Sequence, residues 1–102
     1  MKKFDIIGME VHGYDQREKN VLHQTPGFKM RVIRLAPGGS MPECRMATHV
    51  VLVCVEGCAE VRADGEEVTL SRGQCLVTPP ATLTMESETG ARLLGIQIAE
   101  GD

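Results

Sequence analysis

The chain has 102 residues, which suffices for one domain and leaves no room for a second hydrophobic core. Hydrophobic residues make up 42% of it and charged residues 25%, a composition that excludes intrinsic disorder. A net charge of −3, with two Phe, one Tyr and no Trp, argues against nucleic acid as a partner, because binding a phosphate backbone needs basic clusters and stacking bases needs aromatic rings.

Residues 1–19 are predicted to form a strand and a loop ahead of the main fold. Asp5 and Glu10 interrupt the apolar stretch after the two initial lysines, so the pattern is not that of a signal peptide. The longest apolar run, residues 50–55, is much shorter than the roughly 18 residues of a membrane span. The segment "GYDQREKN" has no apolar periodicity and predicts a surface loop. We therefore expect a cytoplasmic protein that makes no contact with a membrane.

Short β-rich runs follow one another from residue 20 onward. "NVLHQT" and "FKMRVIRLA" flank the turn pair Pro26-Gly27, and "HVVLVCVE" follows the turn at residues 37–39 and its extended continuation. "AEVRADGEEVTL" alternates apolar and polar residues around Asp64-Gly65, a strong hairpin signal. "QCLVTPP", "TLTMES" and "ARLLGIQI" supply the last strands. Many short strands with regular turns predict an all-β sandwich or barrel.

Glycine and proline spacing narrows this prediction. Gly38 and Gly57 match the two ends of the pattern G-x5-H-x-H-x3-E-x6-G, and Gly73 and Pro79 match the start and centre of G-x5-P-x-G-x2-H-x3-N. In these positions the chain resembles the cupin family over residues 20–98. The resemblance implies a jelly-roll barrel, also called a double-stranded β-helix, built as a single domain over residues 1–102.

The metal ligands of that family are not retained at the matching positions. Where the patterns have histidines, this chain has Cys44, Met46 and Thr84. Where they have a glutamate and an asparagine, it has Val50 and Glu88. Since none of the usual imidazole or carboxylate donors remains, we expect no metal and no other cofactor at this site, and we assign no catalytic residue.

Strand alternation predicts which side chains line the barrel. Residues of one parity on a strand point to the same face, so positions 44, 46, 50, 52 and 54 share the interior, with Thr84 opposite. This interior is small, apolar and rich in sulfur, and it predicts a ligand pocket. Its predicted lining residues are Cys44, Met46, Val50, Leu52, Cys54 and Thr84.

The two sulfur residues at the old ligand positions have three interpretations. They can be core packing, because methionine and free cysteine commonly fill apolar interiors. They can form a soft-metal site for Cu(I), with a further donor from His49, Met30, Met41 or Met85. Cys44 could also be a nucleophile, but Arg45 and His49 fall on the opposite face by alternation and leave its thiol without a base.

Cys54 and Cys58 raise the question of a disulfide. Along a continuous strand their Cα atoms would lie about 13 Å apart, whereas a disulfide needs less than about 7 Å. A sharp bend at Gly57 is the one feature that could bring them together. Free, reduced thiols fit a cytoplasmic protein better.

An apolar row on the outer face predicts a partner. Val51, Val53 and Val55 point away from the barrel by alternation, where a solvated sheet face would carry polar residues. The N-terminal segment could cover them, but a second subunit is the better explanation, and we expect a homodimer.

The sequence thus predicts a non-enzymatic cupin that binds or senses an unknown small molecule. The alternative is a metal-dependent cupin enzyme, or a copper binder that uses Cys44 and Met46. Fold alone does not choose between them, because one scaffold hosts many chemistries.

Overall fold

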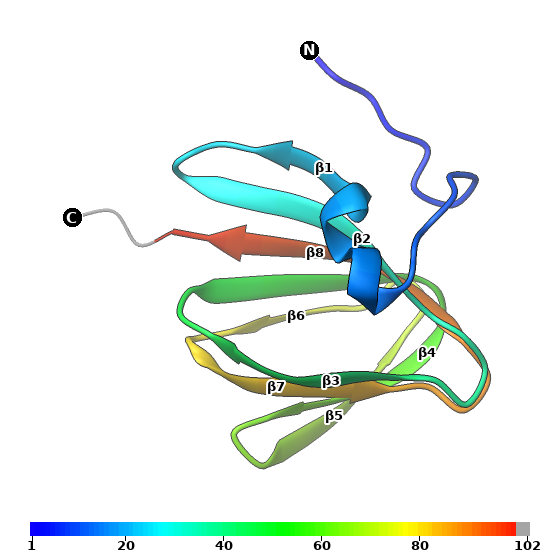
Figure 1. Ribbon diagram of the computed structural model, residues 1–102. Coiled ribbons are helices and arrows are strands. Elements are labelled where there is room, and N and C mark those ends of the chain that lie inside the picture. The colour runs from blue at the N-terminus through cyan, green and yellow to red at the C-terminus, as the bar shows by residue number, and fades with distance from the viewer. Residues whose placement is uncertain (100–102) are drawn as a thin grey trace.

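The computed structural model describes residues 1–99 of the chain. This part consists of eight strands and one short helix, so the predicted all-β fold is confirmed (Figure 1). The elements are η1 (Tyr14–Asn20), β1 (Val21–Gln24), β2 (Phe28–Leu35), β3 (Ser40–Met46), β4 (His49–Ala63), β5 (Glu66–Ser71), β6 (Cys75–Thr78), β7 (Ala81–Glu86) and β8 (Ala91–Ile98).

The strands form one curled antiparallel sheet with two layers. Their order is β1-β2-β8-β4-β7-β3, and β5 and β6 each pair with β4. The 15-residue strand β4 belongs to both layers, because its first half pairs with β8 and β6 while its second half pairs with β5 and β7. Figure 1 shows the layer of β2 and β8 facing the layer of β3 and β7. The result is the predicted jelly-roll form, a half-barrel around one core.

β4 reverses its inward face at Gly57. Up to Cys54 the even-numbered side chains are buried, and from Ala59 onward the odd-numbered ones are. The register with β8 shifts between Cys54 and Glu56, and Gly57 has a left-handed φ of 75°. An extra residue in a strand exchanges its two faces, so this bulge lets one strand serve both layers.

The hairpin between β4 and β5 confirms the sequence prediction. Asp64 and Gly65 have φ angles of 49° and 87°, as a two-residue turn of type I′ requires. The pairing of Ala63 with Glu66 closes the ladder directly behind them. This turn places the second half of β4 and all of β5 in the same layer.

Residues 1–19 differ from the predicted strand and loop. Residues 1–13 contain a turn and no strand, and Tyr14–Asn20 form the 3-10 helix η1. So short a helix needs few contacts with the core, which is why its sequence shows no apolar periodicity. Within residues 1–99 no helix is long and apolar enough to cross a membrane.

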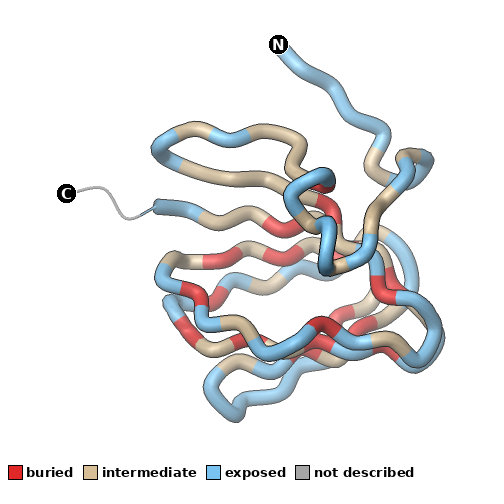
Figure 2. Tube along the Cα trace, viewed as in Figure 1, coloured by how far each residue is buried: buried red, intermediate tan, exposed pale blue. Residues whose placement is uncertain are grey.

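The hydrophobic core lies between the two layers. Figure 2 shows buried positions along the facing strands, while the N-terminal segment and the β4–β5 hairpin remain exposed. Leu52 and Leu93 are among the largest fully buried side chains, and they come from the paired strands β4 and β8. Around them the core contains Met41, Met46 and Met85, so three of the six methionines lie in the interior.

Candidate functional site

The barrel interior is filled by the side chains that were predicted to line a pocket there. Met46, Val50, Leu52 and Cys54 are buried, and Cys44 is half-buried against the same core. The space left beside Met46, Val50 and Leu52 is about 20 Å³, close to that needed for one water molecule. These side chains therefore pack against one another, and the space left beside them has no room for an organic ligand.

Thr84 lies on the opposite face of β7 from its predicted position. Ala81, Leu83 and Met85 are buried along this strand, whereas Thr84 is half-buried and lines a shallow outer depression. The pairing with β3 explains the difference, because Cys44 lies across from Leu83 and cross-strand partners share a face. The prediction that Thr84 faces the interior is therefore wrong.

Cys44 and Met46 lie side by side on the inward face of β3. The Cys44 thiol donates to the Met46 sulfur at 3.5 Å. Their common face agrees with the alternation of the strand. This contact places two soft donors together, which is the geometry that a Cu(I) site would begin from.

Cys54 is a buried thiol held by backbone carbonyls. Its Sγ–H group contacts the oxygens of Glu56 at 3.3 Å and Gly57 at 3.4 Å, within the bulge of β4. Burial raises the pKa of this thiol above its ordinary value of 9.0, and the nearby Cys58 adds to the effect. A proton is therefore retained on Cys54, which makes it a poor nucleophile. All four cysteines are free, so Cys54 and Cys58 do not form a disulfide.

The residues at the metal-ligand positions do not fit the usual metal of this barrel type. Val50 offers no donor atom, and Thr84 points outward. Across residues 1–99, no three His, Cys, Asp or Glu side chains converge into a group that could hold an ion. Iron or manganese held by histidine and carboxylate has no matching donor set in this part of the chain.

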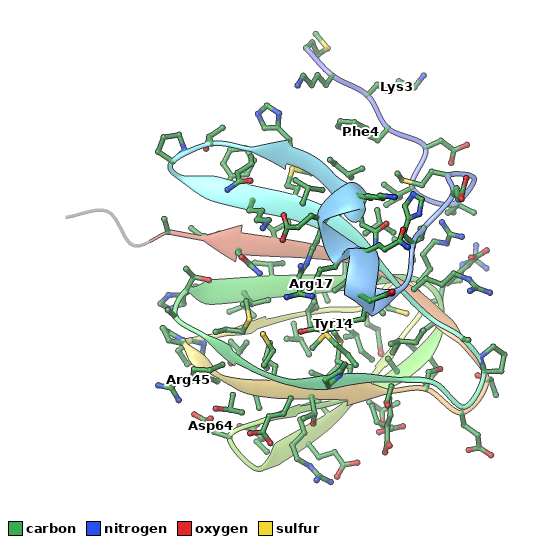
Figure 3. The ribbon with its side chains drawn as sticks, in the orientation of Figure 1. Lys3, Phe4, Tyr14, Arg17, Arg45 and Asp64 are labelled. Carbon is green, nitrogen blue, oxygen red and sulfur yellow. The ribbon has the colours of Figure 1, made fainter. Side chains whose placement is uncertain are left out.

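A larger cavity lies outside the interior, between η1 and the adjacent ends of β2 and β3. Its volume is about 200 Å³. We call it the η1 cavity, and its lining residues are His12, Tyr14, Arg17, Asn20, residues 31–36 and residues 39–41. Figure 3 shows Tyr14 and Arg17 over the open side of the half-barrel, between the layers of β2 and β3.

The outer wall of the η1 cavity is held by specific contacts. The buried Asn20 side chain accepts from the His12 amide at 2.8 Å and donates to the His12 carbonyl at 2.9 Å. Arg17 donates to the Tyr14 carbonyl at 3.1 Å, and its guanidinium lies 4.4 Å from the centre of the Tyr14 ring. These contacts close residues 12–20 into a compact wall, with the Tyr14 ring packed against the core.

The floor of the cavity is apolar and its rim is polar. Leu35 and Met41 are buried residues that contribute to the floor, and the partly buried Ile33 packs against the same core. Arg31 and Arg17 are half-buried at the walls. A concave apolar surface with a few convergent polar groups is the usual form of a small-molecule site.

A wider groove, of about 490 Å³, lies at another place on the surface. Glu60, Glu86 and Glu88 line it together with glycines and small polar residues. It has no large apolar side chain, so it offers a ligand no hydrophobic contact. The η1 cavity is therefore the better candidate site.

Sequence reasoning did not find the η1 cavity. Arg34 also lines it, whereas Arg92 lies elsewhere and is paired with Glu56 at 3.6 Å. His12, Tyr14, Arg17 and Arg31 were not identified, because they lie on separate segments that only the folded chain brings together. The one signal available was an aromatic residue and an arginine three positions apart in an otherwise exposed segment.

Comparisons with known proteins identify the fold. No protein-family model matches the sequence, and no curated protein matches it. A solved RmlC-like cupin protein from Desulfovibrio desulfuricans has 22% sequence identity and a TM-score of 0.79, with 96% of each chain covered. A cupin superfamily protein from Desulfitobacterium hafniense has 16% identity and a TM-score of 0.73, over 90% of this chain and 84% of that one.

A third similar structure comes from an enzyme. Salicylate 1,2-dioxygenase from Pseudoaminobacter salicylatoxidans, a G106A mutant in complex with gentisate, has 23% identity and a TM-score of 0.67. The match covers 72% of this chain but only 21% of the dioxygenase. At such identities the likeness is one of fold alone. The chain therefore has the cupin fold, and its chemistry must be argued from its own residues.

Proposed function

We propose that this protein, a single cupin barrel, binds a small organic molecule as a non-enzymatic binding or sensing module. The observation that carries the proposal is the 200 Å³ η1 cavity, which combines an apolar floor with polar walls. Its volume is smaller than the 300 to 1,000 Å³ typical of pockets for drug-sized ligands. A metabolite of modest size fits it better than a cofactor does.

The residues at the family's reaction centre support a binding role rather than catalysis. Cys44, Met46 and Val50 replace its metal ligands, and they pack in the core. Burial holds the Cys54 thiol in its protonated form. We place the protein in the cytoplasm, where all four free thiols would stay reduced.

Filling the η1 cavity tests the proposal. Ala36 lines the cavity and is exposed, so Ala36→Trp should occupy part of its volume without disturbing the core. Ala47 is an equally exposed alanine in the bend between β3 and β4, so Ala47→Trp is the matched control. The measurement is a screen of small neutral and charged fragments by amide chemical-shift mapping of the labelled protein.

The proposal predicts that fragments shift amides at the η1 cavity in the wild type and in Ala47→Trp. The same fragments should lose at least about tenfold in affinity in Ala36→Trp, because overlap with the new ring removes their contacts. Fragments that bind elsewhere, or bind equally well to Ala36→Trp, would refute the cavity as the binding site.

Copper binding is a second candidate, favoured by the sulfur contact in β3. The Cys44 and Met46 sulfurs are 3.5 Å apart, and Met41 and Met85 are buried in the same core. Thiolate and thioether ligands select Cu(I). Such a site would lie in the interior and would be separate from the η1 cavity.

Titration with Cu(I) tests whether the protein binds copper at this sulfur pair. The protein is purified under reducing, anaerobic conditions, and the wild type and Cys44→Ser are titrated with Cu(I). Stoichiometric copper that is lost in the variant would establish the soft-metal site. If neither protein binds copper, the candidate is excluded and the sulfur pair is core packing.

A further inference from the structure

The walls of the η1 cavity carry a concentration of positive charge. Arg17, Arg31 and Arg34 all line it, and no aspartate or glutamate does. The chain as a whole has 14 acidic and 11 basic residues, so the charge that lines the cavity is opposite in sign to the net charge of the chain. A cavity lined by one sign of charge concentrates ligands of the opposite sign.

These arginines have no acidic partner within the described part of the chain. The ion pairs there join Lys29 to Glu18, Arg62 to Glu67 and Arg92 to Glu56. Glu18 belongs to η1 itself, yet it pairs with Lys29 rather than with an arginine, and neither residue lines the cavity.

The surroundings of Arg31 make the lack of an acidic partner energetically costly. Its side chain is half-buried and borders both the small interior space and the η1 cavity. Met46 and Leu52 line the small interior space beside Arg31, and Leu35 lines the η1 cavity beside it. A guanidinium kept partly from water without a counter-charge is unfavourable, and an anion in the cavity would offset that cost.

We propose that the ligand of the η1 cavity is a small carboxylate with an apolar body, held by Arg31 and Arg17 over the floor of Ile33, Leu35 and Met41. This inference rests on the proposed binding function and names its ligand class. A planar guanidinium matches a carboxylate with two parallel hydrogen bonds. The apolar floor distinguishes such a ligand from inorganic phosphate, which has nothing to place there.

Binding of four probes tests the ligand class. Benzoate carries a negative charge and an apolar ring, and benzamide has the same shape without the charge. Acetate has the charge but almost no apolar body, and inorganic phosphate is an anion with no apolar body at all. Each is titrated into the wild type, Arg31→Gln, Arg31→Lys and the control Arg72→Gln, with amide shifts as the readout. Arg72 is an exposed residue in the turn after β5 and does not line the η1 cavity.

Benzoate should bind the wild type and Arg72→Gln at the η1 cavity, at least tenfold more tightly than the other three probes. Arg31→Gln should weaken benzoate binding at least tenfold, since a hydrogen bond between charged groups is lost. Arg31→Lys should restore part of the affinity, because it returns the charge without the planar fork. Amide dispersion outside the cavity shows that each variant is folded.

Two patterns would overturn the ligand class while leaving the binding function intact. In the first, benzamide binds in the cavity as tightly as benzoate does, and Arg31→Gln does not change the affinity for benzoate. The other is phosphate or acetate binding as tightly as benzoate. If no probe, charged or neutral, shifts any amide at the cavity, both the ligand class and the proposed function are contradicted.

Discussion

Gly57 lies where β4 passes from one layer to the other, and its backbone runs directly against Gly90. Its φ of 75° is unfavourable for any side chain, and an added Cβ would overlap the Gly90 carbonyl oxygen. Gly73 has a similar φ of 83°, but an added Cβ there would meet nothing within 4 Å. Comparing the two glycines therefore separates the cost of a left-handed φ from the cost of the close contact with Gly90.

Gly57→Ala should destabilise the protein by at least about 3 kcal/mol, because left-handed strain and backbone overlap act together. Gly73→Ala should cost only about 1 to 2 kcal/mol, since it carries the strain alone. Urea unfolding of the two variants provides the comparison. Equal losses would show that the contact with Gly90 does not matter.

The Cys54 thiol makes stability depend on alkaline pH. Burial raises its pKa in the folded state, so the unfolded chain releases this proton at a lower pH than the folded chain does. The contribution of this thiol to the free energy of unfolding should be constant at pH values below 9.0, the ordinary pKa of a thiol. The contribution should fall as the pH rises above that value.

Cys54→Ala should therefore reduce the slope of stability against pH above 9.0, whatever its effect on stability at neutral pH. Cys75 is exposed, so Cys75→Ala is the control and should leave the slope unchanged. The measurement is urea unfolding between pH 7 and 10.5 under reducing conditions. The same slope in wild type and Cys54→Ala would contradict the assignment.

The position of η1 depends on one side chain. Asn20 ends the helix and binds both the amide and the carbonyl of His12, so it replaces a pair of backbone hydrogen bonds. Its side chain is 5% exposed, and removing it would leave two backbone groups of His12 without these partners.

Asn20→Ala should open residues 12–20 locally, at a cost of about 2 kcal/mol for two hydrogen bonds. Amide hydrogen exchange in this segment should then be roughly thirtyfold faster, while exchange in β4 and β8 changes little. Gln16 is exposed on the same helix, and Gln16→Ala is the control. Unchanged exchange in Asn20→Ala would mean that other contacts hold η1 in place.

The elements also show how far the sequence could be interpreted. Strands, hairpin and barrel were predictable because alternation, Asp64-Gly65 and the glycine spacing all agree. Thr84 was misplaced because the register of β7 is set by its pairing with β3, which a linear pattern does not contain. The η1 cavity was missed because a 3-10 helix without periodicity forms one of its walls.

The outer face of the β2–β8 layer remains apolar. Val51 and Val53 on β4 lie across from Ile96 and Leu94 on β8, and Val77 on β6 lies across from Val51. Val77 is 67% exposed. A continuous exposed apolar face is typical of an association surface.

The N-terminal segment covers this face only in part. Arg92 donates to the carbonyls of Ile6 and Met9 at 3.2 and 2.8 Å, which ties the segment to β8. Phe4 and Ile7 nevertheless remain exposed, by 38% and 52%. We propose that a second copy of the chain covers the rest, as a two-fold dimer.

Sedimentation at micromolar concentration should give a dimer, with twice the 11.1 kDa of the single chain. Val77→Asp should dissociate it without unfolding the chain, because a charge would have to be buried in the interface. Val68 is an exposed valine on β5 in the other layer, so Val68→Asp should leave the dimer intact. A monomeric wild type would refute the proposal.

The position of a bound ligand distinguishes the η1 cavity from the barrel interior. With benzoate as the probe, nuclear Overhauser effects from its ring protons to protein methyl groups report where it lies. We predict contacts with the methyl groups of Leu35 and Ala36, which line the η1 cavity and not the interior space. Contacts confined to Val50, Leu52 and Leu83 would place the ligand in the barrel interior and contradict binding in the η1 cavity.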